Sequence, residues 1–104
     1  MAPDTKPTIL LIEDSQQLRW TISMHFRALG WRVLRARSAA PALAVIARRK
    51  VDAVVIDKDL PCDGGADPLP ALKRAGIPVV AVEGPAPELD ALESRLRRLI
   101  GAND

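Results

Sequence analysis

The chain is poor in the residues that carry several common kinds of chemistry. Among its 104 residues there are no tyrosines, one phenylalanine and two tryptophans, which leaves little aromatic surface for stacking nucleic-acid bases. We expect Trp20 and Trp31 to be packing residues rather than ligand platforms. The single cysteine, Cys62, excludes an intrachain disulfide and fits a reducing cytoplasm. The single histidine, His25, is expected at the surface and has no serine or cysteine paired with it by spacing, which argues against a nucleophilic triad.

Long apolar runs and strong charge are also missing. No stretch approaches 18 uninterrupted apolar residues, so the sequence predicts no membrane span. The net charge of +2 reflects a slight excess of arginine rather than a basic tract, and it does not favour nucleic acid as a partner. We therefore expect a cytoplasmic protein with a flexible lead-in over residues 1–7, one domain over 8–101 and a tail over 102–104.

Short apolar segments alternate with amphipathic ones along the chain. Apolar runs typical of strands cover residues 8–12, 31–36, 51–56 and 77–82. Helical spacing is found between Ser15, a candidate cap, and Gly30, and again over 41–50, 70–75 and 88–100. In the second of these helices Leu43, Val45 and Ile46 are expected to face inward. This alternation predicts an α/β fold with a parallel sheet covered by helices on both faces.

Acidic residues end two of the predicted strands. Glu13 and Asp14 end the first, and Asp57 ends the third. In such sheets ligands bind at the carboxyl ends of the strands, so neighbouring strands would bring three carboxylates together and raise the pKa of at least one. Oxygen-only ligands suit Mg²⁺, and a carboxylate beside that ion can accept a phosphoryl group. The alternative is that these acids only cap the following helices.

Residues 8–84 resemble the receiver domain of bacterial response regulators, the CheY-like family. The resemblance rests on Ile9-Leu10-Leu11-Ile12-Glu13-Asp14 with Arg19, on Val51-Asp52-Ala53-Val54-Val55-Ile56-Asp57 followed by Leu60-Pro61 and Gly65, and on Ile77-Pro78-Val79-Val80-Ala81-Val82. It implies a flavodoxin-like open parallel sheet, here with four strands in the order 2-1-3-4. It also implies a two-component signalling module that is not an enzyme beyond autocatalytic phosphoryl acceptance.

The resemblance also assigns roles to individual residues. Asp57 takes the phospho-acceptor position, Asp14 the direct Mg²⁺-ligand position and Glu13 the water-mediated one, and the backbone carbonyl of Asp59 supplies a third metal contact. The chain departs from the family at Glu83, which replaces the Thr or Ser that contacts the phosphoryl group. The family's fourth helix and its fifth strand, with the lysine at that strand's end, are absent. These departures favour a degenerate pseudo-receiver that acts by binding a protein partner, which would be a histidine kinase, a phosphotransferase or a downstream effector.

Three other functions stay open at this point. One is a working phospho-acceptor in a phosphorelay, with Asp57 phosphorylated by a histidine kinase. Another is a small phosphatase or phosphotransferase with an Asp nucleophile, although the sequence offers no second motif for it. The third is a nucleotide or second-messenger sensor that uses an anion-binding face, for which the candidate residues are Arg32, Arg35, Arg37, Arg48 and Arg49. These arginines also fit an ordinary solvated surface.

Loss of the fifth strand would leave residues 77–82 at the edge of the sheet, where only Pro78 discourages pairing with another chain. We therefore expect a homodimer about a two-fold axis. Its expected interface residues are Val80, Leu89, Leu92, Leu96 and Leu99. The alternative is a monomer in which the last helix covers the gap.

Overall fold

A computed structural model describes residues 6–60, 67–84 and 86–101 of the chain. The strands are β1 (Thr8–Ile12), β2 (Arg32–Ala36), β3 (Ala53–Asp57) and β4 (Val79–Val82). The helices are α1 (Gln16–Ala28), α2 (Ala39–Arg48), α3 (Leu69–Ala75) and α4 (Leu89–Gly101). Cys62, Gly65, most of the lead-in and the tail lie outside the described residues. Of the helices just given, none is long and apolar enough to cross a bilayer.

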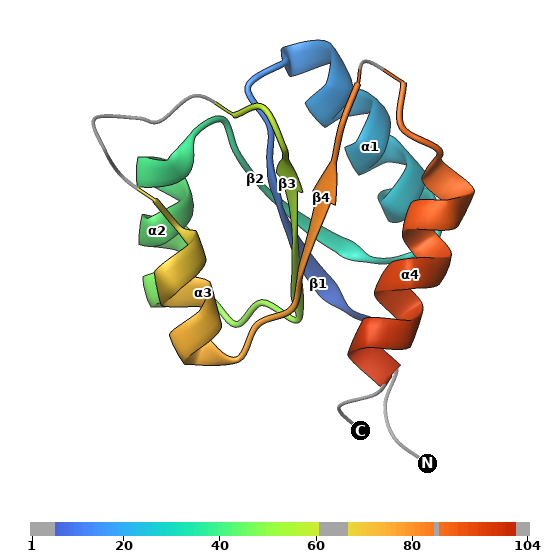
Figure 1. Ribbon diagram of the computed structural model, residues 1–104. Helices are drawn as coiled ribbons and strands as arrows, with labels where there is room; N and C mark the ends of the chain where they lie inside the picture. The colour runs from blue at the N-terminus through green and yellow to red at the C-terminus, as the bar shows by residue number, and fades with distance from the viewer. Residues whose placement is uncertain (1–5, 61–66, 85, 102–104) are drawn as a thin grey trace.

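The four strands form one parallel sheet in the order β2-β1-β3-β4, as predicted (Figure 1). In the register, Ile12 lies opposite Ala36 on one side and Ile56 on the other. The residues that follow β1 and those that end β3 therefore meet at the carboxyl edge of the sheet. This edge is where ligands bind in open α/β sheets.

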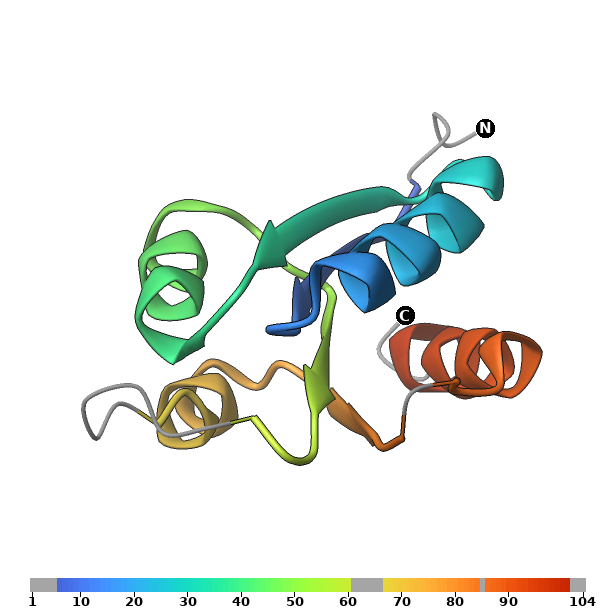
Figure 2. The same ribbon diagram turned by 90° about the horizontal axis from the view of Figure 1, so that it is seen from above.

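Helices cover both faces of the sheet. Figure 2 shows α1 and α4 on one face and α2 and α3 on the other. Side chains in β1 alternate between the two cores: Ile9 and Leu11 pack toward α1 and α4, while Leu10 and Ile12 pack with residues of α2 and α3. All four are completely buried, which explains why the run has no polar residue.

Local signals set the ends of the helices. The Ser15 hydroxyl accepts a hydrogen bond from the Leu18 N–H at 3.2 Å and caps α1, and Gly76, with φ of 72°, ends α3 in the left-handed conformation. Helix α2 begins two residues before the predicted start at Pro41, because proline is tolerated in the first turn, where its missing N–H has no intrahelical acceptor.

The buried face of α2 differs from the prediction. Its fully buried residues are Ala39 and Ala42. Val45 and Ile46 are only partly buried against the same core, and Leu43 is half-buried outside it. The small alanines let the helix lie close to the sheet, which turns the larger side chains toward the flanks of the contact.

Helix α4 packs on its own sheet. Val80 is 2% exposed, Leu92 5% and Leu96 0%, and Leu89 and Leu99 are partly buried against the same core. The five apolar residues that were expected at a dimer interface thus pack in the core of a single chain. This happens because α4 folds back beside α1 and covers β3 and β4 (Figure 2). On the same side, the Arg97 guanidinium of α4 lies 5.4 Å from the ring centroid of Trp31.

Candidate functional site

Three carboxylates gather at the carboxyl edge of the sheet, as predicted. Glu13 and Asp14 directly follow β1, and Asp57 is the last residue of β3. One carboxylate oxygen of each residue lies within 4.8 Å of one from each of the others. The adjacency of β1 and β3 in the sheet produces this cluster.

Glu13 is the buried member of the cluster. Its side chain is almost completely enclosed, with 2% of the residue exposed. Burial raises the pKa of its carboxyl group from 4.5 to about 7. The Ser15 N–H, which donates to Glu13 Oε2 at 3.1 Å, opposes the increase, whereas Asp14 and Asp57 add to it. A raised pKa was expected from mutual repulsion of the carboxylates; the rise is found at Glu13, with burial as its main cause and the neighbouring carboxylates as a smaller one.

Backbone hydrogen bonds hold Asp57 in place. The Asp59 N–H donates to Asp57 Oδ1 at 3.0 Å, and the Leu60 N–H donates to the Asp57 carbonyl at 3.1 Å. The Lys58 N–H donates to the Val82 carbonyl at 2.8 Å and ties this turn to the end of β4. The hydrogen bond from the Asp59 backbone N–H therefore fixes the orientation of the half-buried Asp57 carboxylate.

The chemistry of this cluster fits a magnesium ion. All three side chains offer oxygen, and one of them is a buried carboxyl whose ionised form is disfavoured without a counter-charge. A divalent cation among Glu13, Asp14 and Asp57 would offset the cost of ionising the buried Glu13 carboxyl, which is the main cause of its raised pKa, and the smaller repulsion from its neighbours.

Glu83, which the resemblance predicts at the position of the family's Thr or Ser, pairs with the lysine that follows Asp57. Lys58 Nζ lies 3.2 Å from Glu83 Oε2, and both side chains are well exposed, at 61% and 70%. The pair forms because Asp57 lies opposite Val82 in the β3–β4 register, which places the next residue of each strand side by side. Sequence reasoning identified both residues but missed their contact.

The five candidate arginines do not form one patch. All are exposed. Arg32 begins β2, and Arg48 and Arg49 end α2 close to the start of β3, so these three lie toward the amino edge of the sheet.

The other two arginines lie toward the carboxyl edge. Arg35 and Arg37 line an open surface pocket of about 850 Å³ together with Trp20. Trp20 is 60% exposed, so the prediction that it is a packing residue is wrong, whereas Trp31 is only 4% exposed. Trp20 lies on the solvent-exposed side of α1, and the spacing of apolar residues along the helix did not reveal this.

Known proteins resemble the chain over most of its length. It is 32% identical over 99 residues to the probable transcriptional regulatory protein TcrX of Mycobacterium tuberculosis, a match covering 93% of this chain and 41% of TcrX. The chain spans less than half the length of the curated relatives it matches. No family model matches it.

Solved structures give the same result for the fold. The Francisella response regulator 1452 receiver domain superposes with a TM-score of 0.80 at 21% identity, over 95% of this chain and 100% of that one. The receiver domain of the sensor histidine kinase PA1611 from Pseudomonas aeruginosa, solved with magnesium in its active-site cleft, gives a TM-score of 0.68 at 24% identity, over 93% and 99%. The chain thus has the fold of CheY-like response-regulator receiver domains and resembles such regulators in sequence over most of its own length.

Proposed function

We propose that this receiver binds Mg²⁺ through Glu13, Asp14 and Asp57, that Asp57 accepts a phosphoryl group poorly or not at all, and that the domain signals by contact with a protein partner. The observation that carries the proposal is the Lys58–Glu83 pair, which lies beside an otherwise well-formed acidic cluster. The partner would be a histidine kinase, a phosphotransferase or a downstream effector, in the cytoplasm.

The chemistry at Asp57 explains the weak acceptance. For transfer, a carboxylate oxygen of Asp57 would form a bond to phosphorus while the bond from phosphorus to the leaving group breaks. A bound Mg²⁺ supplies positive charge for the transferring oxygens. Glu83 has no hydroxyl to donate, and its negative charge repels the incoming group. Lys58, the basic residue next to Asp57, is held by Glu83 instead.

We expect little phosphorylation of the wild-type chain by a small donor. Incubation with acetyl phosphate and MgCl₂, followed by intact-mass measurement, should leave most chains unlabelled. Glu83→Thr removes the repelling charge and frees Lys58, and it should raise the initial labelling rate by about tenfold, equivalent to roughly 1.4 kcal/mol of barrier. Asp57→Asn is the control and should abolish the added mass in both backgrounds.

Two results would contradict this proposal. Rapid, near-complete and long-lived labelling of the wild-type chain would favour the working phospho-acceptor of a phosphorelay instead. An unchanged rate in Glu83→Thr, with both proteins folded, would show that the Lys58–Glu83 pair does not limit transfer.

We further propose that two copies associate through the open edge of β4. The Val54 N–H donates to the Pro78 carbonyl and the Lys58 N–H to the Val82 carbonyl, so alternate residues of β4 direct their backbone groups toward β3. The backbone groups of Val79 and Ala81 then face outward, away from the sheet.

This association is expected to appear as a dimer in sedimentation velocity at micromolar concentration. Ala81→Pro removes one outward N–H without changing a bond to β3, and it should shift the protein toward the monomer. Ala81→Ser keeps the N–H and should leave the dimer intact. A wild-type chain that sediments as a monomer throughout the concentration range would exclude the interface.

A further inference from the structure

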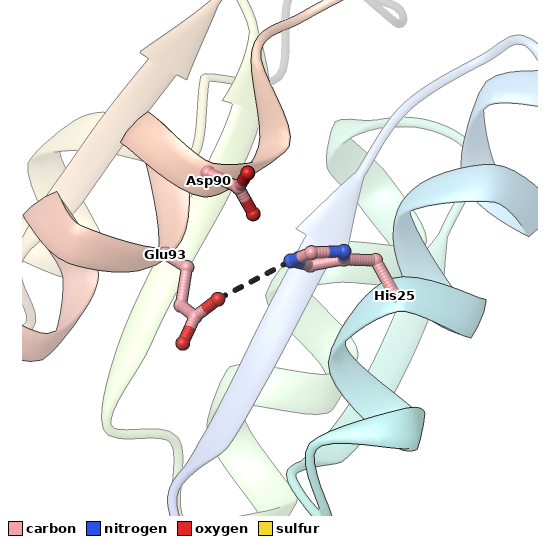
Figure 3. Close-up of side chains that lie close together, drawn as sticks. All are labelled: His25, Asp90 and Glu93. Carbon is pink, nitrogen blue, oxygen red and sulfur yellow. Dashed lines mark ion pairs between the residues drawn. The ribbon is translucent and has the colours of Figure 1, made fainter.

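A second group of metal-ligating side chains lies between α1 and α4, away from the acidic edge. His25 projects from α1, and Asp90 and Glu93 project from α4 (Figure 3). One potential ligand atom of each lies within 4.8 Å of the others. Asp90 and Glu93 are three residues apart, which places them on the same face of their helix. Figure 3 shows both carboxylates on the side of α4 that faces the imidazole.

The imidazole nitrogen at the centre of this group lacks a hydrogen bond. His25 Nε2 is buried and has no hydrogen-bond partner among the described residues. Glu93 Oε1 lies 3.4 Å from it, close enough for an ion pair but without hydrogen-bonding geometry. Buried polar atoms are normally satisfied, and a bound ion is one of the recognised explanations for an exception.

Neighbouring contacts hold the ligand atoms toward the centre. The His25 ring packs edge-on against Phe26, with centroids 5.1 Å apart. Arg97 Nε donates to Glu93 Oε2 at 2.9 Å, which leaves Oε1 directed toward the histidine. Such outer contacts orient metal ligands in known sites.

We propose that His25, Asp90 and Glu93 form a binding site for a divalent transition-metal ion, of which Zn²⁺ is the reference case. An imidazole nitrogen with two carboxylates suits Zn²⁺ and its neighbours better than Mg²⁺, which prefers oxygen alone. Ligands about 2.0–2.1 Å from a tetrahedral Zn²⁺ lie roughly 3.3 Å from each other. The 3.4 Å between His25 Nε2 and Glu93 Oε1 is close to this separation, and the fourth position would be open to water.

The bound ion would join α1 to α4. Because α4 supplies Leu92 and Leu96 to the core over β3 and β4, the ion would hold in place the helix that closes this face of the sheet. Metal binding to the folded chain would then stabilise the fold by mass action.

Two measurements on the whole chain test this site. Titration with CoCl₂ should produce visible absorption bands with a stoichiometry of one, and excess ZnCl₂ should remove them while MgCl₂ should not. Saturating ZnCl₂ should raise the thermal midpoint by at least about 5 °C. Because thiolates also bind zinc, both measurements are made in a Cys62→Ser background.

Matched variants locate the effect. His25→Gln and, separately, Asp90→Asn should each weaken Co²⁺ binding by at least about tenfold. Glu88→Gln removes a charge just before α4 but outside the cluster, so it should bind Co²⁺ as the parent does. Binding that is absent in the parent, or unchanged in folded His25→Gln and Asp90→Asn, would overturn the proposal.

Discussion

Replacing Leu96 by alanine is expected to lower the free energy of unfolding by roughly 2–5 kcal/mol. Leu96 is completely buried in the middle of α4, in the core that also contains Val80 and Val82 of β4. Its removal leaves a cavity between the helix and the sheet. The total free energy of unfolding of native proteins is only about 5–15 kcal/mol. Urea unfolding should therefore show a large decrease in the urea concentration at the midpoint.

Leu69→Ala is the matched control for this experiment. It makes the same chemical change near the start of α3, where Leu69 is 46% exposed, and it should alter stability by no more than about 0.5 kcal/mol. Equal, small effects of the two substitutions would show that α4 does not pack on the sheet as described. The comparison therefore tests whether α4 is part of the core.

The metal-free protein is expected to lose stability as the pH rises from about 4.5 to about 7. The pKa of Glu13 is raised from 4.5 to about 7 in the folded chain, mainly by burial. In this interval the folded state binds the proton and the unfolded state releases it, so the free energy of unfolding decreases with pH. Below about 4.5 the stabilising contribution of the protonated carboxyl is complete, and it is lost as the pH passes through the folded-state pKa.

The expected loss in the free energy of unfolding is about 3 kcal/mol, because each unit of pKa shift corresponds to about 1.36 kcal/mol. It is measured by urea unfolding at pH 5 and pH 8 in EDTA, comparing wild type with Glu13→Gln. The glutamine variant keeps the side-chain volume but cannot ionise, so its stability should change much less between the two pH values. A wild-type chain as stable at pH 8 as at pH 5, with an indistinguishable Glu13→Gln profile, would contradict the buried carboxyl.

Much of the fold was predictable because its signals are local. Runs such as Thr8–Ile12 are apolar on both faces, which occurs when helices cover a parallel sheet on both sides. The acidic cluster was predictable for a related reason, since carboxyl ends of adjacent parallel strands meet whatever the details of packing. Strand limits were less accurate: Val51 is buried but lies before the paired residues of β3.

The remaining parts of the site depend on how elements pack. The Lys58–Glu83 pair follows from the register of β3 and β4, and the contact of His25 with Glu93 follows from the placement of α4 beside α1. Residues 25 and 93 are far apart in the chain, and neither belongs to a motif. Neither the composition of the chain nor the spacing of its residues could therefore predict that His25 and Glu93 lie close together.

Because Arg97 of α4 lies over Trp31, the fluorescence of Trp31 should report on the position of α4. Trp31 is buried beneath Arg97 of α4, whereas Trp20 is 60% exposed to water. A shielded indole emits at shorter wavelength than a hydrated one, so the two fluorophores are spectrally distinct. Movement of the last helix would expose Trp31 and shift its emission to the red, while Trp20 would serve as an internal reference.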